Sequence, residues 1–286
     1  MRVVAAAALL LAGCVAAPER PAPPAPAPAP VAVVPPARPL LVAPATAAQG
    51  GLIRGVAIGG TLLLDGEPVQ VAPDGRFVIG FDRDAGPASV LTLVGPDGER
   101  DDRRVSVAPV AWPIERVNAP FRAGRANAEF EALRPAELAR VAAAWNTRTD
   151  AEGWRQPLRW PAAGRLSGRF GAQRVYQGKP GSYHSGADVA VPTGTPVTAP
   201  ADGVVTLAAE RPLTLEGNLL MIDHGAGLGS ALLHLSRIDV REGDRVRQGQ
   251  PVGLSGATGR VSGPHLHWSL RWRNAKLDPL LAAGDP

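Results

Sequence analysis

The sequence predicts a mainly β protein in which a small β-sandwich-like domain and a short helical segment precede a compact antiparallel β domain. Short apolar runs separated by turn residues fill residues 49–118 and 161–286, and residues 123–147 carry the one convincing helical pattern. The chain has 33 glycines and only 5% aromatic residues, which favours many turns and short strands. Its 286 residues are enough for about two ordinary domains, and a hydrophobic content of 45% can fill their cores.

The N-terminal residues have the layout of an export signal. Met1 and Arg2 precede the apolar run Val3–Leu11, which is too short to cross a bilayer as a helix. The following Leu-Ala-Gly-Cys14 resembles the lipobox of bacterial lipoproteins. This resemblance implies that residues 1–13 are a signal peptide and that the Cys14 thiol is acylated and anchors the chain to a membrane. An ordinary secretory signal with an incidental cysteine is the alternative.

Residues 14–48 are expected to form a linker. Pro, Ala and Val dominate it, and such a segment builds no core but favours an extended polyproline II spacer of about 3.1 Å per residue. A disordered leader without a specific purpose is the alternative. Val15 is not the aspartate expected to retain lipoproteins in the inner membrane. We therefore expect a cell-envelope location, at the periplasmic face of the outer membrane.

Residues 49–118 are expected to form a small antiparallel sandwich that acts as an accessory domain. Asp65-Gly66 and Asp74-Gly75 supply turns between its apolar runs. The segment contains no histidine and no group of carboxylates that demands a chemical role. Its expected strands cover residues 61–64, 69–71, 76–79 and 90–94.

Residues 119–160 are expected to be a helical connector, with a helix within 123–147. Pro135 suits the first turn of a helix, and Phe130 and Leu133 would then belong to a preceding turn or short helix. The expected apolar face comprises Leu138, Val141, Ala142 and Trp145. The next aromatic residues, Trp154 and Trp160, are interpreted as core residues rather than as a sugar-binding platform.

Residues 161–286 are expected to form the compact antiparallel domain, because no long helical pattern interrupts their apolar runs and glycine-rich turns. Its expected strands cover residues 195–199, 203–208, 218–223, 230–235, 251–255 and 265–271. All five histidines of the chain lie in this domain, between residues 184 and 267.

The histidine motifs suggest a metal site. His265 and His267 are two apart on an expected strand and therefore share one face, while Leu266 and Trp268 point to the opposite layer. Imidazole and carboxylate are ligands that zinc accepts, and three protein ligands with one water make an open, catalytic site. The chain therefore suggests a single zinc ion.

His234, His184 and Asp188 complete the candidate site. On its expected strand His234 shares a face with Leu232, and three imidazoles can then converge on one surface of a sheet. His184 and Asp188 lie four apart, a spacing that would also bring them together on a helix. The intervening Gly186 argues instead for a loop that runs into a strand.

The motifs His184-x-x-x-Asp188, Leu-His234-Leu-Ser and His265-x-His267 closely resemble the signature of the LytM/lysostaphin-type zinc endopeptidases, which cut peptidoglycan peptides. The resemblance covers residues 164–280. Many members carry tyrosine two residues before the middle histidine, where this chain has leucine. That departure affects transition-state stabilisation and not metal binding. Other matching motifs are Ser167-Gly168-Arg169-Phe170-Gly171, Gly194-Thr195-Pro196-Val197, Ala201-Asp202-Gly203-Val204-Val205, Ile222-Asp223-His224-Gly225, Gly243-Asp244-x-Val246-x-x-Gly249-Gln250 and Gly256-Ala257-Thr258-Gly259.

Residue by residue, the resemblance implies that His184, Asp188 and His267 are zinc ligands and that His234 and His265 are the catalytic pair outside the metal shell. One of the pair would help to deprotonate the attacking water, and the other would stabilise the oxyanion or protonate the leaving amine. The implied function is a zinc-dependent endopeptidase acting on the stem and cross-link peptides of bacterial peptidoglycan. The alternative is an inactive LytM-type binding module that activates or regulates other cell-wall hydrolases.

Several residues near these motifs receive other interpretations. His224 is expected to be structural or to support a ligand, and Asp223 to be a turn residue. Arg169, Arg174 and Tyr176 are candidate substrate contacts, with solvated loop residues as the alternative.

Other functional classes find less support in the sequence. The chain has no Gly-x-Ser-x-Gly elbow of a serine hydrolase, and its glycines at 225–229 lack the spacing that nucleotide binding requires. The formal charge of +4 comes without a basic run with interleaved aromatic residues, so no nucleic-acid partner is expected. The isoelectric point near 9.9 suits an anionic cell-wall polymer. The sequence does not identify envelope protein partners.

Overall fold

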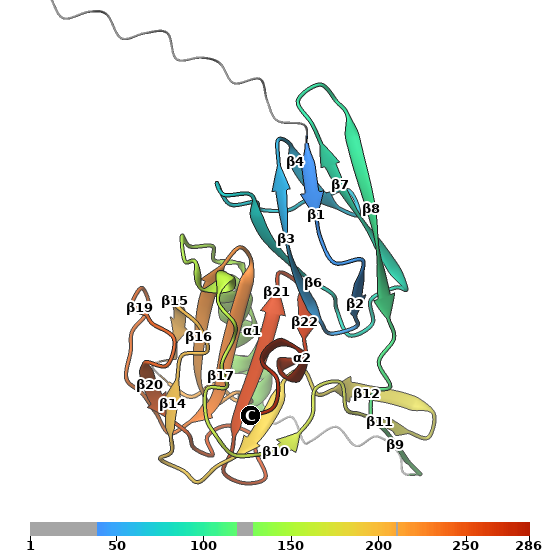
Figure 1. The fold of residues 1–286 in the computed structure, drawn as a ribbon. Helices are drawn as coiled ribbons and strands as arrows, with labels where there is room; N and C mark the ends of the chain where they lie inside the picture. The colour runs from blue at the N-terminus through green and yellow to red at the C-terminus, as the bar shows by residue number, and fades with distance from the viewer. Residues whose placement is uncertain (1–38, 119–127, 210) are drawn as a thin grey trace, which may run out of the picture. The chain divides into compact units, whose positions relative to one another are not determined.

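The computed structural model describes residues 39–118, 128–209 and 211–286. The predicted signal peptide, the acylation of Cys14 and most of the predicted linker lie outside the described residues, as does the start of the predicted helix. Among the described residues, no helix is long and apolar enough to cross a membrane. Strands dominate, and the prediction of a mainly β fold is confirmed (Figure 1).

The N-terminal β domain consists of two sheets whose apolar side chains meet in one core. Phe77, Ile79, Leu91 and Leu93 are completely buried in it. The Asp65-Gly66 turn has positive φ at both residues, as a two-residue hairpin requires. The first sheet contains β1 (Leu40–Val42), β3 (Leu52–Ile58) and β6 (Arg76–Gly80); the second contains, in spatial order, β2 (Thr46–Ala48), β8 (Arg100–Ala108), β7 (Ala88–Val94), β4 (Thr61–Leu64) and β5 (Glu67–Pro68).

Three expectations for this region are wrong. β1 and β2 lie in the segment expected to be linker, and Leu41 is buried, so residues 39–48 belong to the β domain. Residues 69–71 are not a strand, because β5 ends at Pro68 and Val69 turns into the core. β2 and β8 are parallel, so the domain is not purely antiparallel.

Helix α1 (Ala128–Asn146) runs through Pro135 instead of beginning there. Phe130 and Leu133 therefore belong to the same helix and not to a separate turn. The predicted apolar face is also partly wrong, since Leu138 is 50% exposed and Ala142 is exposed.

The face of α1 that packs against the rest of the domain is apolar near one end of the helix and charged nearer the other. Near its C-terminal end, Val141, Ala144 and Trp145 pack with apolar residues of the sheet. Arg134 and Glu137 lie on the same face one to two turns earlier, with side chains only 15% and 14% exposed. The helix is therefore attached by apolar contacts at one end and by polar contacts at the other.

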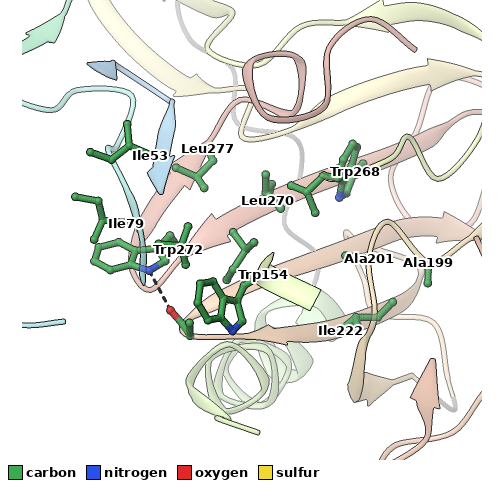
Figure 2. Packing of buried hydrophobic residues seen from close by; sticks show 14 of the residues in the cluster. Ile53, Ile79, Trp154, Ala199, Ala201, Ile222, Trp268, Leu270, Trp272 and Leu277 are labelled. Atoms are coloured by element: carbon green, nitrogen blue, oxygen red, sulfur yellow. Dashed lines mark hydrogen bonds between the residues drawn. The ribbon is translucent and has the colours of Figure 1, made fainter. Parts of the chain in front are cut away.

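The C-terminal domain is built on an eight-stranded antiparallel sheet. One face of this sheet is covered by α1, and the other carries the main core, where Trp268 and Leu270 are fully buried (Figures 1 and 2). In spatial order the strands are β10 (Arg165–Gly168), β13 (Ala187–Ala190), β21 (Leu266–Trp272), β17 (Leu228–Leu235), β16 (Asn218–Gly225), β15 (Gly203–Ala208) and β19 (Arg245–Val246), with β22 (Ala275–Leu277) paired to β21.

Smaller elements surround this sheet. Trp154 is buried, as predicted, and Trp160 packs edge-on against Trp268. The smaller elements are a sheet of β14 (Pro196–Thr198), β20 (Pro251–Leu254) and β18 (Arg237–Ile238), a sheet of β12 (Lys179–Tyr183), β11 (Gln173–Tyr176) and β9 (Ile114–Val117), the 3-10 turn η1 (Gly153–Arg155) and helix α2 (Pro279–Ala283).

The N-terminal β domain makes direct contacts with the C-terminal domain. Figure 2 shows Ile53 and Ile79 beside Leu277 and Trp272, and all four belong to one apolar cluster. The segment that follows the N-terminal domain adds β9 to the edge of β11 as a parallel strand. The two domains therefore share apolar packing and a sheet edge.

Arg83 is one of the polar contacts between the two domains. It is 6% exposed and donates two hydrogen bonds, of 3.2 and 3.0 Å, to the carbonyl oxygen of Gly171. Its guanidinium carbon lies 4.5 Å from the centre of the Tyr183 ring. A buried charge is tolerated only when it is hydrogen-bonded in this way.

We predict that Arg83→Met lowers the free energy of unfolding by about 2–3 kcal/mol, because charge-assisted hydrogen bonds in a buried place are lost. Urea denaturation followed by tryptophan fluorescence measures the change. Arg103→Met is the control, since the Arg103 side chain is 58% exposed and pairs only at the surface. Equal stability of the two variants would contradict the prediction.

Candidate metal centre

The pairing of β13 with β21 places Asp188 directly opposite His267. Residues paired across a sheet share a face, so the carboxylate and the imidazole lie side by side. On the other face of the same strands, Val189, Leu266 and Trp268 are completely buried in the main core. The apolar core therefore fixes the register that brings the two polar groups together.

His184 reaches the same place from the loop between β12 and β13. Its carbonyl accepts a hydrogen bond of 2.9 Å from Gly171, and its N–H donates one of 2.8 Å to Ala172. Gly186 lets the loop pass close to β21, because a Cβ there would lie 2.5 Å from His267 Nε2. The expected loop that runs into a strand is confirmed.

Three potential ligand atoms converge at this point. His184 Nε2 lies 3.1 Å from Asp188 Oδ1 and 3.1 Å from His267 Nδ1, and the last two atoms are 2.7 Å apart. Ligand atoms at about 2.0–2.1 Å from a tetrahedral zinc ion would be about 3.3 Å apart. The three side chains thus form a cluster of the size that zinc requires.

The outer hydrogen bonds of both imidazoles leave a lone pair aimed at this cluster. A carbonyl oxygen only accepts, so His184 Nδ1, 3.0 Å from the Arg169 carbonyl, carries the proton. The Ser269 hydroxyl donates to the Ser185 carbonyl and therefore accepts from His267 Nε2 at 2.9 Å. His184 Nε2 and His267 Nδ1 are left unprotonated in the neutral rings. This arrangement fits a metal ion.

The electrostatics of the cluster also favour a cation. Burial alone would raise the pKa of Asp188, but hydrogen bonds from His184 and His267 outweigh it and hold that pKa far below its usual range. Burial opposes protonation of His184, yet Asp188 outweighs it and raises the His184 pKa. Burial lowers the pKa of His267. In the absence of a metal ion, the carboxylate therefore stays ionised and attracts a proton to His184.

His234 joins the cluster through an irregularity in β17. Leu232 and Leu233 pair with Trp268 and His267, so regular alternation would turn His234 towards the core side of Leu232, away from His267. Instead the register of β16 and β17 shifts at this point and His234 has φ of 65°. Its ring centre then lies 6.2 Å from that of His267.

The expectation that His234 shares a face with Leu232 is therefore wrong, although the predicted convergence of imidazoles is observed. Leu232 is buried in the main core, whereas His234 faces the other imidazoles. A left-handed backbone at a residue with a side chain costs about 1–2 kcal/mol, so other contacts must hold it.

His265 and His234 form a second pair beside the three-residue cluster. Their ring centres are 4.8 Å apart, and His265 Nε2 lies 3.7 Å from Asp188 Oδ1. His265 Nδ1 is 2.9 Å from the carbonyl of Gly263, and His234 Nδ1 is 2.9 Å from that of Thr258. Both rings therefore carry the proton on Nδ1 and present Nε2 as an acceptor when neutral. Burial lowers the pKa of His234 to about 4.

An open cleft of about 1040 Å³ adjoins the cluster. His184 and Asp188 line one part of it, and β9, β11 and β12 line another. Arg174 and Tyr176 face this cleft, so they are placed where a substrate would lie. The Arg174 guanidinium forms an ion pair of 2.7 Å with Glu115 of β9.

The stretch of chain that holds these residues is similar to a known protein family. Residues 182–279 match peptidase family M23. This stretch therefore resembles an M23 peptidase domain. The matched span includes the three clustered residues and the His234–His265 pair.

Similar proteins include enzymes named for cell-wall chemistry. The peptidoglycan DD-endopeptidase ShyA of Vibrio cholerae is 42% identical over 119 residues, which are 41% of this chain and 27% of ShyA. The DD-carboxypeptidase/endopeptidase Mpg of Neisseria meningitidis is 42% identical over 100 residues, 35% of this chain and 23% of Mpg. The chain thus spans about a quarter of the length of these relatives.

One solved structure resembles most of the chain. It is a Pseudomonas aeruginosa structure assigned to peptidase M23, with 29% identity and a TM-score of 0.63, and the match covers 83% of this chain and 94% of that one. The similarity therefore extends beyond the M23 domain to much of the N-terminal region.

Other predicted residues lie away from the cluster of His184, Asp188 and His267. His224 is completely buried, bonded to the Asp202 carbonyl and the Ser230 hydroxyl, in agreement with a structural role. Asp223 is not a turn residue but lies in β16, where it accepts two hydrogen bonds from Thr149. The Arg169 side chain is exposed, and its carbonyl orients His184.

Sequence reasoning missed the residues that orient the imidazoles. Ser269 follows His267 by two positions on β21, so strand alternation could have found it. Thr258, Gly263 and the loop around Glu216 act through backbone atoms, which any residue type possesses. Of these, only Thr258 stands in one of the motifs named above, Gly256-Ala257-Thr258-Gly259.

The pKa directions predict how zinc affinity depends on pH. The proton attracted to His184 must leave before zinc binds, while Asp188 is already ionised and His267 already neutral. Below the pKa of His184, affinity should therefore fall about tenfold per pH unit, the slope for release of one proton. Zinc titration against a competing chelator measures the slope. A slope of two protons, or none, would contradict this prediction.

Proposed function

We propose that this chain is a zinc-dependent endopeptidase that hydrolyses peptide bonds in the stem and cross-link peptides of bacterial peptidoglycan. The observation that carries the proposal is the convergence of His184, Asp188 and His267, with the His234–His265 pair beside them. The names of ShyA and Mpg, to which part of this chain is similar, support peptidoglycan as the substrate.

His184, Asp188 and His267 would hold the zinc ion. The chemistry that the ion supplies when bound is a polarised substrate carbonyl and a water whose pKa falls from 15.7 towards about 7. Ser269 and the Arg169 carbonyl keep the two imidazoles in the tautomers needed for binding. Two imidazoles and one carboxylate also leave a coordination position for the water.

His265 would be the general base in the proposed reaction. Its Nδ1 proton is held by the Gly263 carbonyl, so Nε2 can take a proton from the attacking water. The water oxygen bonds to the carbonyl carbon, the C–N bond breaks, and the proton passes from His265 to the leaving amine. Burial lowers the pKa of His234 to about 4, which leaves that ring a weak base.

His234 would act as a hydrogen-bond acceptor. At neutral pH its Nδ1 proton is committed to the Thr258 carbonyl, and its free Nε2 can accept from the water or from a substrate N–H. A neutral ring in this tautomer cannot donate to an oxyanion through Nε2. We therefore assign it to positioning the reactants rather than to oxyanion stabilisation.

The rival function is an inactive module that activates other cell-wall hydrolases. Such a module needs a peptide-binding surface but no complete metal cluster. Here each expected ligand residue is present and each imidazole has an outer partner that fixes its tautomer. This completeness favours the enzyme.

We also propose that the protein acts in the cell envelope, exported by its signal peptide and anchored by acylated Cys14 to the periplasmic face of the outer membrane. The sequence motif at Leu11-Ala12-Gly13-Cys14 supports this proposal. A peptidoglycan substrate requires an envelope location.

The cleft suggests that the substrate peptide carries a carboxylate. Arg174 and Arg260 both line it, and Arg174 already has Glu115 as a counter-ion. In the part of the chain that the structure describes, the Arg260 side chain has no ion-pair partner. A guanidinium in the same cleft as His184 and Asp188 suits a substrate carboxylate, which it can bind through two hydrogen bonds.

We predict that His184, Asp188, His267 and His265 separate into two groups when replaced by alanine. His184→Ala, Asp188→Ala and His267→Ala should lose both zinc and hydrolysis of purified sacculi. His265→Ala should keep about one zinc per chain and lose about 10²–10⁴-fold in rate, because only proton transfer is removed. Elemental analysis and identification of the released fragments measure both properties. Zinc-loaded, folded protein that releases no fragments would favour the activator.

We predict that Arg260→Ala raises KM about tenfold for a peptide carrying a free carboxylate near the cleaved bond, as expected for one lost charge-assisted contact. The same variant should leave KM unchanged for the corresponding carboxamide. Arg247→Ala is the control, because Arg247 is exposed in a different cavity. An equal effect on both peptides would show that Arg260 does not bind the carboxylate.

A further inference from the structure

His234 needs support because of its backbone conformation. It has φ of 65° at a register shift between β16 and β17, in the left-handed region that favours glycine. Its ring faces His265 and His267 only because of this conformation. Whatever stabilises the backbone at His234 therefore also places the imidazole.

The backbone of His234 is held by the short loop 213–217. The N–H of His234 donates a hydrogen bond of 2.9 Å to the carbonyl of Glu216. Leu213 and Gly217 close the loop with two backbone hydrogen bonds, of 2.9 and 3.0 Å. The loop thus supplies the partner for an N–H that the regular ladder does not satisfy.

The same loop also contacts the residue that orients the ring. A Cβ on Gly217 would clash with Thr258, so the two backbones lie in close contact. The N–H of Asn218, the next residue, donates to the Thr258 hydroxyl at 2.9 Å. The carbonyl of Thr258 in turn receives the His234 Nδ1 proton. Movement of the loop would therefore disturb both the backbone and the ring of His234.

Charged side chains of helix α1 form hydrogen bonds with this loop. Arg134 donates from Nη1 and Nη2 to the two carboxylate oxygens of Glu216, both at 2.7 Å. Glu137 accepts from the N–H and the hydroxyl of Thr214 at 2.7 and 2.6 Å. Arg134 and Glu137 also bond to each other at 3.1 Å. The loop is thus held on both sides by one face of α1.

We propose that Arg134 is a positioning residue of the active site, which acts through Glu216 to hold His234 in its left-handed conformation. This inference rests on the proposed function, because it assigns α1 a part in that reaction. Arg134 itself touches neither the metal cluster nor the cleft lining. Bidentate contact fixes direction as well as distance, which a strained backbone requires.

The test compares Arg134→Met with Arg140→Met. Both arginines lie on α1 and pair with a glutamate of the sheet domain, but the Arg140–Glu242 pair is 44% and 50% exposed and contacts no residue that touches His234. Arg134→Met should lower kcat about 10–100-fold with KM within twofold, since misplacement by about 1 Å can cost 10²-fold. Zinc content should stay at one per chain. Arg140→Met should change neither, and Arg134→Lys should fall between Arg134→Met and the unaltered chain.

A double-mutant comparison separates positioning from general stability. In a His234→Ala background, Arg134→Met should produce no further loss of kcat, because its effect passes through His234. A loss of the same size in both backgrounds would overturn the proposal. So would an unchanged kcat in Arg134→Met alone.

Hydrogen exchange of the His234 amide tests the proposal without activity. Arg134→Met should make that amide exchange about tenfold faster at a temperature where the fold is intact, while Arg140→Met leaves it unchanged. Unchanged protection in Arg134→Met would refute the positioning role. If the unaltered chain cuts no peptidoglycan but the exchange result is as expected, the proposed function is wrong and the positioning of His234 by Arg134 is still supported.

Discussion

The antiparallel pairing of β13 with β21 is the constraint on which the site depends. It puts Asp188 opposite His267 on one face and Val189 opposite Leu266 in the core. A slip of the register by one residue would bury the carboxylate and expose the apolar side chains. Exposing Leu266 and Trp268 to water would cost several kcal/mol, so the slip is strongly disfavoured. The site geometry is therefore enforced by apolar packing behind the sheet.

Strand periodicity explains which parts of the site could be predicted. His265 and His267 are two apart, and Leu266 and Trp268 are core residues as expected. His234 could not be placed in this way, because regular alternation assigns it to the opposite face. Only the register shift and the left-handed backbone bring it to the other imidazoles. Such features arise from loop contacts that no local pattern encodes.

The same limit applies to the rest of the fold. The turn at Asp65-Gly66 was predictable because its residue types carry the required φ angles. β1 and β2 were not predicted because their segment is rich in alanine and proline, a composition typical of linkers. In the folded chain Leu41 of β1 is buried in the core of the N-terminal domain. In α1 the spacing of apolar residues predicted that Leu138 would pack against the domain, but Leu138 is exposed. Arg134 and Glu137 lie on the packed face instead. Their partners lie far away in the sequence, so only the folded chain reveals them.

His184 and His234 share one kind of support. His184 is bonded to residues 171 and 172, and Arg83 holds the Gly171 carbonyl from the N-terminal domain. His234 is bonded to Glu216, which Arg134 holds from α1. Apolar contacts bring elements together without fixing a direction, whereas a guanidinium fixes both distance and direction. Asp188 and His267 need no such support because the β ladder already orients them. The chain thus uses a buried arginine, Arg83, and a partly buried one, Arg134, to support His184 and His234, whose geometry the sheet alone does not determine.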